Sequence, residues 1–414
     1  MDKAPIADPW FQPLFAERIG GTNYGKGSKI YKFEKIKRAK RAALAQHPER
    51  RLLDFGIGEN DDLADGLVRE TLKREVDKLE NRGYADNGIA AFKEAAASFM
   101  KKAFGVSLDP VAEINHAIGS KPAFAMLPAV FINPGDVTLM TVPGYPVAGT
   151  HTAYYGGEVY KLPLRKENSY YPDLAAIPAD IRKRAKLLVI NYPNSPTGAI
   201  ATRDFYRQVI DFAHTNRIVV VQDAAHLSLT YEGAPLSFLL LDGAKEVGVE
   251  VHSLSKGFNM IGWRMGFVAG HAKIVQAFAD VKDNCDSGQF MAIQQAAKAA
   301  LEHPEIADRT REKYRRRLHK LVAALTKVGF KARMPSGTYF LYVRAPRGCA
   351  GQEFANAEEV SQFLIADQSV CCVPWDDAGA YLRFSVTYLA KDEAEENSLM
   401  EETVSRLSRL DLRF

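Results

Sequence analysis

The chain has 414 residues, of which 47% are hydrophobic and 25% are charged, and its formal net charge is +4. A chain of this size and composition can bury a large core divided among two or three structural units. The nearly balanced charge gives no global sign of binding to nucleic acid or to an anionic membrane surface, so neither is expected as a partner.

The sequence lacks the usual signals of exported and metal-binding proteins. No apolar run is long enough to span a bilayer, and the first residues, MDKAPIADPWFQ, contain neither a continuous apolar segment nor a small-residue cleavage site. The four cysteines include no C-x-x-C pair, and the adjacent Cys371 and Cys372 would form only a strained disulfide. We therefore expect a cytoplasmic protein without a metal site.

The first part of the chain, up to about residue 50, has no core of its own. We expect an arm followed by a helix from Phe33 to Ala45. The cluster of basic residues from Lys26 to Arg41 is interpreted as the solvated face of an oligomer arm. A short strand from Leu52 to Phe55 follows. The next residues, GIGEND, lack the third glycine of a dinucleotide motif, so Gly58 is expected in a glycine turn over a ligand.

Two helical patterns come next, from Leu67 to Leu79 and from Ala90 to Phe104. The turn residues NRGYADNG separate them and place Tyr84 in an irregular loop. A tyrosine in such a loop either packs over the turn or binds a ligand, and the loop itself leaves both open.

The segment from Ile114 to Leu254 alternates short apolar runs with helical patterns such as Pro122 to Phe131 and Arg203 to Asn216. This alternation predicts a mostly parallel sheet covered by helices on both faces. Several of the strands end in polar or glycine-rich residues, which would gather at one edge of the sheet. The expected strands are Ile114 to Ala117, Val137 to Val142, Glu158 to Leu162, Leu187 to Asn191, Ile218 to Gln222 and Val249 to Ser253.

After Ala269 the pattern changes to long helices, including Gln294 to Leu301 and Thr310 to Val328, and then to a smaller α+β unit. We place the domains at residues 1–50 (arm), 51–300 (large domain) and 301–414 (small domain). The small unit is expected to contain strands Lys331 to Met334, Thr338 to Arg344, Val370 to Val373 and Tyr381 to Ser385, a helix Ala357 to Ala366, and a closing helix that runs to Phe414.

One stretch carries the strongest chemical signal, Val249 to Gly266, which reads VEVHSLSKGFNMIGWRMG. A buried strand here delivers Lys256 to its carboxyl end, where desolvation would make the amine a nucleophile that forms a Schiff base with a carbonyl. The hydroxyl groups of Ser253 and Ser255 and the guanidinium of Arg264 would suit a phosphate. An aldehyde with a phosphate describes pyridoxal 5′-phosphate, although in isolation such a lysine is more often a surface residue.

Other polar residues extend this hypothesis. Asp223 ends a strand of β-branched residues, where its carboxylate needs a positive partner such as a protonated pyridine nitrogen, an arginine or a helix terminus. Ser120 and Lys121 open a helix after Gly119 and either bind an anion through backbone N–H groups or simply cap the helix.

Two further side chains stand in unusual places. Tyr145, in the turn P-G-Y-P, would either lie against a planar ring or pack in the core. Arg383 lies inside the apolar strand Y-L-R-F-S. There it would either bind a carboxylate through two nitrogens of its guanidinium group or form a structural salt bridge.

The order of these motifs resembles a known family. The motifs G-S-K, P-G-Y-P, N-Y-P-N-S-P-T-G, a strand ending in Asp, S-L-S-K with G-W-R-x-G behind it, and Y-L-R-F-S occur in sequence from about Leu52 to Phe384. Together they look like the fold type I pyridoxal phosphate-dependent aminotransferases of the class I/II branch. The resemblance implies a large domain with a mostly parallel seven-stranded sheet, a smaller α+β domain and an amino-terminal arm.

The resemblance also implies roles for the residues. Lys256 would form the Schiff base, Asp223 would pair with the pyridinium nitrogen, and Arg383 would hold the α-carboxylate of the substrate, with Gly58 and Tyr145 bordering it. Tyr84 would reach the cofactor phosphate of a neighbouring subunit, which implies a homodimer with shared active sites. The residues expected around the cofactor are Ser120, Lys121, Tyr145, Asn194, Ser195, His226, Ser253, Ser255 and Arg264.

Two positions depart from the family pattern. The asparagine that usually precedes Pro-Thr-Gly is Ser195 here, with Asn194 one residue earlier, and the tyrosine usually found three positions after the aspartate is His226. Both family side chains help to hold the phenolic oxygen of the cofactor, so we expect unusual cofactor absorbance with the same core reaction.

The resemblance implies that the substrate is an L-amino acid and that a 2-oxo acid is the acceptor. Within the branch the chain looks most like LL-diaminopimelate aminotransferases, which act with 2-oxoglutarate and glutamate in lysine biosynthesis, while alanine and aspartate aminotransferases share the same features. The candidates for binding the distal amine are Glu59, Asp61, Asp62 and Asp86. A lyase on the same fold, or a regulator that kept it, is a further alternative, although the segment before the first strand is short for a DNA-binding domain.

Overall fold

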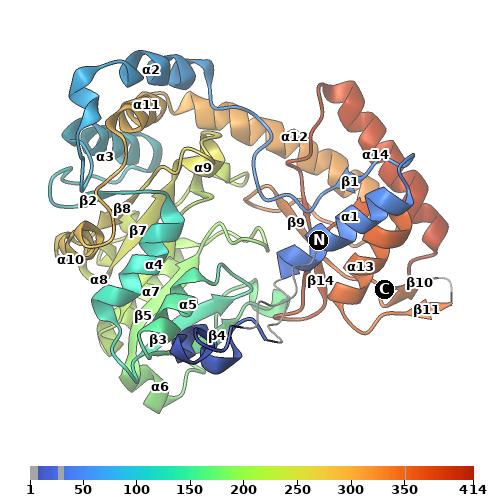
Figure 1. Cartoon of the computed structure of the whole chain (residues 1–414), viewed down its shortest axis with the longest axis horizontal. Helices are drawn as coiled ribbons and strands as arrows, with labels where there is room; N and C mark the ends of the chain where they lie inside the picture. Colours follow the sequence, from blue (N-terminus) through green and yellow to red (C-terminus); the bar gives the residue numbers. More distant parts are fainter. Residues whose placement is uncertain (1–7, 27–31, 350) are drawn as a thin grey trace.

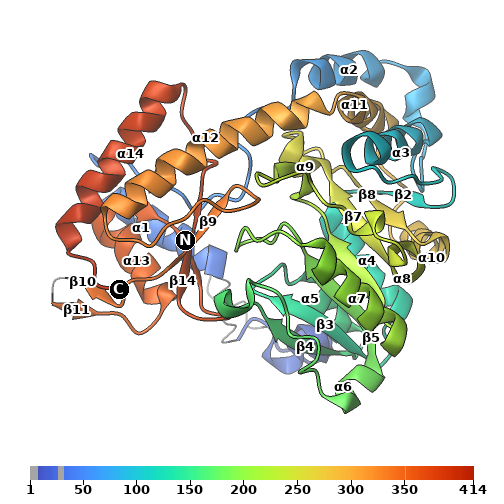
Figure 2. The ribbon, with the colours of Figure 1, turned by 180° about the vertical axis from the view of Figure 1, so that it is seen from behind.

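The protein is described from a computed structural model, and the structure describes residues 8–26, 32–349 and 351–414. Two parts of the predicted arm, residues 1–7 and 27–31, lie outside the described residues. Figure 1 shows two lobes joined by the long helix α12 (Glu305–Lys327), and Figure 2 shows the same arrangement from behind.

A seven-stranded sheet forms the larger lobe, in the order β2-β8-β7-β6-β5-β3-β4. The strands from β7 to β4 run parallel to their neighbours, whereas β8 is antiparallel to both β7 and β2. This confirms the predicted α/β fold with a mostly parallel sheet. The strands are β2 (Ile114–Ala117), β3 (Val137–Val142), β4 (Glu158–Pro163), β5 (Ala185–Asn191), β6 (Val219–Asp223), β7 (Gly248–Ser253) and β8 (Gly266–Gly270).

The ranges predicted for β2 to β7 are confirmed to within two residues. Strand β8 is missing from the predicted ranges, because its apolar residues Phe267 to Ala269 form only a short run between two glycines. Such a run is easily taken for the end of the preceding loop. Strand β8 is defined by its antiparallel hydrogen bonds with β7 and β2, which cannot be recognised from so short an apolar run.

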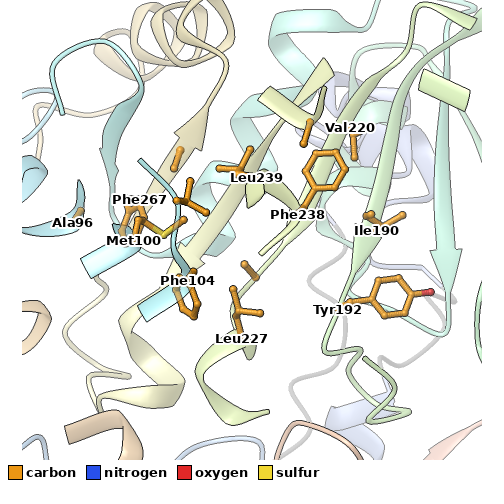
Figure 3. Close-up of a cluster of buried hydrophobic side chains, with 14 of the residues drawn as sticks. Ala96, Met100, Phe104, Ile190, Tyr192, Val220, Leu227, Phe238, Leu239 and Phe267 are labelled. Carbon is orange, nitrogen blue, oxygen red and sulfur yellow. The ribbon is translucent and has the colours of Figure 1, made fainter. Parts of the chain in front are cut away.

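Helices cover both faces of this sheet because successive side chains of each strand point to opposite sides. Val220 enters the core that contains Phe205 and Phe238, part of which Figure 3 shows, whereas Val221 enters the core on the other face with Phe278. The first face is covered by α3 (Ala90–Phe104), α7 (Arg203–Asn216) and α11 (Met291–Glu302), and the second by α4 (Ser120–Phe131), α5 (Val147–Tyr154) and α10 (Ala272–Asp283).

Local sequence fixes where these helices begin and end. Helix α7 starts after Thr202, whose side chain accepts a hydrogen bond from the backbone N–H of Phe205 at 3.1 Å. Helix α3 stops at Gly105, which adopts a φ of 75° and donates its N–H to the last carbonyls of the helix. Short helices complete the lobe: α2 (Gly66–Val76), α6 (Ala179–Arg184), α8 (Ala244–Val247) and α9 (Leu254–Gly257).

The smaller lobe is built on a three-stranded antiparallel sheet in the order β13-β14-β9. The amino-terminal segment joins this lobe, because α1 packs against α13 and β1 pairs with β12. The elements are α1 (Lys32–Gln46), β1 (Leu53–Asp54), β9 (Phe340–Arg344), β10 (Gly348–Cys349), β11 (Gln352–Glu353), α13 (Ala357–Gln368), β12 (Val370–Cys371), β13 (Val373–Trp375), β14 (Tyr381–Ser385) and α14 (Glu393–Leu407).

Three predicted elements of the chain need correction. No strand forms at Lys331 to Met334, since the alternating pattern there finds no neighbouring strand to pair with. The closing helix ends at Leu407 and is followed by a single 3-10 turn, and α2 ends at Val76, because Leu79–Arg82 forms a separate 3-10 helix, η4.

The predicted domain boundaries stay a prediction, because elements near them contribute to both lobes. Helix α12 places Ile306 in the core of the large lobe and Leu318 in the core of the small lobe. Phe55 packs in the small-lobe core, although it lies within the range assigned to the large domain.

A buried ion cluster ties α12 to the loop that follows β1. Arg317, whose side chain is 1% exposed, donates to Asp61 at 2.9 Å and to Glu396 at 2.7 Å. Burial alone would raise the pKa of Glu396, but hydrogen bonds from Arg316, Lys320 and Arg317 outweigh it and lower this pKa to about 2. The cluster therefore holds the turn around Gly58 in place through the ion pairs of Arg317 with both carboxylates.

Among the described residues, no helix is both long enough and apolar enough to cross a bilayer.

Candidate active site

A cavity of about 650 Å³ lies where the ends of the large-lobe strands meet the small lobe. Polar residues that follow β2, β3, β5, β6 and β7 line one part of it, and residues of α1, β9, β13 and β14 line the other. The predicted site residues that line this cavity are Gly58, Ser120, Lys121, Tyr145, Ser195, Asp223, His226, Ser253, Ser255, Lys256, Arg264 and Arg383.

Lys256 lies at the centre of these groups, in the short helix α9 directly after β7. Its Nζ donates a hydrogen bond to the carbonyl oxygen of Gly58 at 3.0 Å, and the same carbonyl accepts from the hydroxyl of Tyr339 at 2.9 Å. Its own backbone carbonyl accepts from Asn60 at 2.7 Å. The turn after β1 is therefore held against the lysine from two sides.

Asp223 ends β6 and is 7% exposed. Burial raises the pKa of its carboxyl group from 3.8 to about 6, although a hydrogen bond from the N–H of Ala225 and the charges of His252 and Lys256 act in the opposite direction. Its backbone carbonyl accepts from the side chain of Asn191 at 3.0 Å. The site thus contains a buried acid that a cationic ligand would favour in its ionised form.

A cationic, hydroxyl-lined corner surrounds the start of α4. Arg264 has a φ of 55° and donates from Nη1 to the hydroxyl of Ser255 at 3.3 Å and to the carbonyl of Ile261 at 2.9 Å. Gly119, with a φ of 80°, leaves room for it, since a Cβ there would lie 2.3 Å from Nη2 of Arg264. The helix start and the guanidinium together suit an anion.

His226 is buried at the wall of the cavity, beside two aromatic rings. Its ring centre lies 5.2 Å from that of Tyr339 and 5.8 Å from that of Phe340. Burial, and then the charges of Lys256 and Arg383, hold its pKa well below 6.5, so the imidazole is neutral at physiological pH. Its Nδ1 has no hydrogen-bond partner among the described residues.

Arg383 enters the cavity from β14, the central strand of the small sheet, and is 5% exposed. Its Nη2 donates to the carbonyl of Gly56 at 3.2 Å, and its guanidinium carbon lies 4.1 Å from the centre of the Phe340 ring. Packing on the ring fixes the plane of the guanidinium, which favours recognition of a planar carboxylate.

Two predicted residues do not line the cavity. Asn194 is fully buried, and its Oδ1 accepts hydrogen bonds from the backbone N–H of Thr197 at 3.1 Å and from its hydroxyl at 2.6 Å, so the side chain shapes the turn. Asn191, three residues earlier, lines the cavity instead. Tyr84 is 82% exposed in the loop after η4 and does not contribute to the cavity of its own chain.

The family model for aminotransferases of class I and II matches residues 50–399 of the chain.

The chain belongs to this family.

Curated relatives and solved structures agree with the match. The chain is 56% identical to the LL-diaminopimelate aminotransferase of Methanocaldococcus jannaschii over 98% of its own length and all of the relative's. It is 53% identical to the protein of the same name from Methanococcus maripaludis, over 98% of the chain and all of that protein. Substrate-bound BacF from Bacillus subtilis superposes with a TM-score of 0.85 at 30% identity, over 94% of this chain and 97% of that one.

This aminotransferase depends on pyridoxal 5′-phosphate, and the cavity fits that group by three observations. The acid at Asp223 is buried and needs a cation, which the ring nitrogen can be. The corner at Gly119 and Arg264 is kept open and positive, as a phosphate requires. The unpaired Nδ1 of the buried His226 is a polar atom that a ligand oxygen would satisfy. These family relatives support an aminotransferase over the lyase and the regulator.

Several cavity residues of this aminotransferase were missed from the sequence. Asn191 lies inside the N-Y-P-N-S-P-T-G motif and could have been found by asking which asparagine ends the strand. Others come from segments outside the motifs that only the tertiary fold brings to the cavity, and they are Lys32, Phe33, Phe340, Trp375 and Asp377.

We predict that Asp223→Asn stabilises the cofactor-free protein at pH 8. The folded-state pKa of Asp223 lies above its unfolded value, at about 6 instead of 3.8, so its contribution to stability is full below pH 3.8 and is lost as the pH rises through 6. At pH 8 the ionised group costs about 3 kcal/mol, which the amide avoids. Thermal denaturation of both cofactor-free proteins should show a higher transition for the variant, with the difference shrinking towards pH 4.

Asp204→Asn is the matched control, because Asp204 is also an aspartate of the large lobe but its side chain is 83% exposed. We expect this variant to unfold within about 0.5 kcal/mol of the wild type at both pH values. Equal stability of Asp223→Asn and wild type at pH 8 would show that the buried carboxyl group carries no such cost.

Proposed function

We propose that this aminotransferase transfers an amino group from LL-2,6-diaminopimelate to 2-oxoglutarate, or in the reverse direction, with tetrahydrodipicolinate and glutamate as the other pair, in lysine biosynthesis. The observation that carries the proposal is its full-length similarity to two LL-diaminopimelate aminotransferases with which it shares more than half of its residues. Alanine and aspartate remain the donors against which this substrate has to be tested.

The following roles are part of the proposal. When bound, pyridoxal 5′-phosphate supplies an aldehyde that condenses with amines and a ring that withdraws electrons from the α-carbon of the substrate. Lys256 holds the cofactor through its amine and, once freed, takes the proton from that α-carbon. Asp223 keeps the ring nitrogen protonated. Arg383 binds the α-carboxylate with both nitrogens of its fork, next to Gly58.

The remaining cavity residues hold the cofactor in this proposal. Ser120 and Lys121, through the backbone at the start of α4, bind the phosphate together with the Ser253 and Ser255 hydroxyls and Arg264. Tyr145 lies against the ring. Ser195 and His226 face its phenolic oxygen in place of the side chains usual in the family. Asn194 is left out, because its side-chain oxygen is used within its own turn.

The structure narrows the candidates for the distal amine of diaminopimelate. Asp61 is paired with Lys313 and Arg317, and Asp62 is paired with Lys313. Asp86 does not line the cavity, whereas Glu59 does. We therefore propose that Glu59 attracts the distal ammonium group.

The substrate proposal predicts that purified enzyme forms glutamate from LL-diaminopimelate and 2-oxoglutarate. We expect kcat/KM for this donor to exceed the values for alanine and aspartate by at least about tenfold, the discrimination that one well-placed polar contact provides. Glutamate production, followed with each donor at equal concentration, is the measurement. Lys256→Ala should form none, and rapid turnover of alanine without turnover of diaminopimelate would reject the substrate.

We also propose that the enzyme is a homodimer in which Tyr84 completes the partner's site. Tyr84 is exposed and follows, in the same segment of the chain, several other exposed apolar side chains: Leu63, Leu67, Val76 and Leu79. Exposed apolar residues concentrated in one segment are typical of a surface that another chain covers. The hydroxyl of Tyr84 would reach the phosphate corner of the second copy.

Mixed dimers test this arrangement. A dimer of one Tyr84→Ala chain and one Lys256→Ala chain contains one site with both changes and one site with neither. We expect such hybrids to retain cofactor at one site with wild-type affinity, measured by absorbance after dialysis. Hybrids that bind as weakly as the Tyr84→Ala homodimer, or a monomer in sedimentation, would contradict the shared site.

Finally, we propose that the enzyme works in the cytoplasm. All four cysteines are free thiols, including the neighbours Cys371 and Cys372, which fits a reducing compartment. Fractionation of cells that produce the enzyme should place the activity in the soluble extract, and activity confined to an exported or membrane fraction would reject the proposal.

A further inference from the structure

The cavity contains a second cation in the neighbourhood of Arg383. Lys32, the first residue of α1, lines the cavity together with Trp375, Asp377 and Arg383. Its ammonium group lies 3.3 Å from the centre of the Trp375 ring. The residue lies in the amino-terminal segment, more than two hundred positions before Lys256, so the helix brings a charge into a site that the motifs do not include.

Among the described residues, Lys32 differs from two other lysines of its helix, Lys35 and Lys40, in having no ionic partner. Lys35 pairs with Glu358 and Lys40 pairs with Asp54, whereas Lys32 forms no ion pair with a described carboxylate. The Trp375 ring holds the ammonium by a cation–π contact, which neutralises none of its charge. The charge therefore remains available to an anion that enters the cavity.

The surroundings make this site favourable for an anion while keeping the lysine charged. The pKa of Lys32 is lowered from 10.5 to about 8, mainly by burial and also by the nearby charge of Arg383, while the charges of Asp377 and Asp376 act in the opposite direction. The group is thus mostly protonated at neutral pH but poorly solvated. A carboxylate bound to it would replace part of the lost hydration.

We propose that Lys32 binds the distal carboxylate of the amino donor, an inference that rests on the proposed diaminopimelate substrate. LL-diaminopimelate carries an amino-carboxylate group at each end. Arg383 takes the carboxylate next to the reacting carbon, and Lys32 takes the one at the far end. Alanine has no second carboxylate, so this contact separates the two donors by charge. Lys32 is a specificity-determining residue, and it takes no part in moving the proton.

A purely structural role for Lys32 is the competing explanation. In that case the ammonium only anchors α1 to Trp375, and its loss would disturb every substrate to the same extent. Three ligands distinguish the explanations. LL-diaminopimelate has both distal groups, L-2-aminopimelate keeps the distal carboxylate but lacks the distal amine, and L-lysine keeps the amine but lacks the carboxylate.

The test compares wild-type holoenzyme with Lys32→Met. Apparent dissociation constants are measured for the three ligands from the change in cofactor absorbance, together with the rate at saturation. We expect the constants for LL-diaminopimelate and L-2-aminopimelate to rise by about tenfold to a hundredfold, the range for a charge-assisted hydrogen bond. The constant for L-lysine and the saturated rates should stay within about twofold of wild type. Lys32→Arg should recover most of the affinity.

Lys37→Met is the matched control, because Lys37 lies on the same helix but is exposed and does not line the cavity. It should leave all three constants unchanged. An equal rise for all three ligands in Lys32→Met, or no rise for the two dicarboxylates, would overturn the inference. Wild-type enzyme that does not react with LL-diaminopimelate would end the proposed function, and the contrast between L-2-aminopimelate and L-lysine would still decide the role of Lys32.

Discussion

The carboxyl group of Asp223 lies at the buried end of a strand, and the cost of ionising it there is the constraint on which the site depends. Four consecutive β-branched residues, Ile218 to Val221, draw this segment into the sheet, and the aspartate follows into the interior. Its raised pKa is the physical sign that the fold alone does not satisfy the charge. The protein thus keeps an unsatisfied acid where a cationic ring nitrogen can be received, at the expense of its own stability.

The two lobes contribute different parts of the same cavity. The large lobe presents Lys256, Asp223 and the anion-binding corner from strand ends whose spacing the sheet fixes. The small lobe and the amino-terminal helix present Arg383 and Lys32. Helix α12 contributes residues to both hydrophobic cores, and the buried cluster around Arg317 fixes the turn that carries Gly58. These contacts hold the two parts of the cavity in position relative to each other.

Local patterns were sufficient for six of the seven strands of the large-lobe sheet and for most of the residues that line the cavity, because hydrophobic periodicity and strand-end polar residues are properties of short segments. Local patterns did not predict the position of a side chain where a tertiary contact determines it. Asn194 was predicted to bind the cofactor because of its place in the motif. Its side chain instead accepts hydrogen bonds from Thr197, and Asn191 lines the cavity. Lys32 was interpreted as part of a solvated basic face. Its contact with Trp375 could not be predicted from local pattern, because the two residues are more than three hundred positions apart.

This division explains why the reaction is easier to infer than the substrate. The groups proposed for the chemistry lie within a few residues of motifs at one sheet edge, where a change in any of them would disturb the cofactor. The groups proposed for the distal end of the substrate, Lys32 and Glu59, come from α1 and from the turn after β1, and neither lies on a strand of the large sheet. Those segments can therefore change the accepted side chain while the buried acid and the lysine stay in place, which is how one fold comes to serve many amino donors.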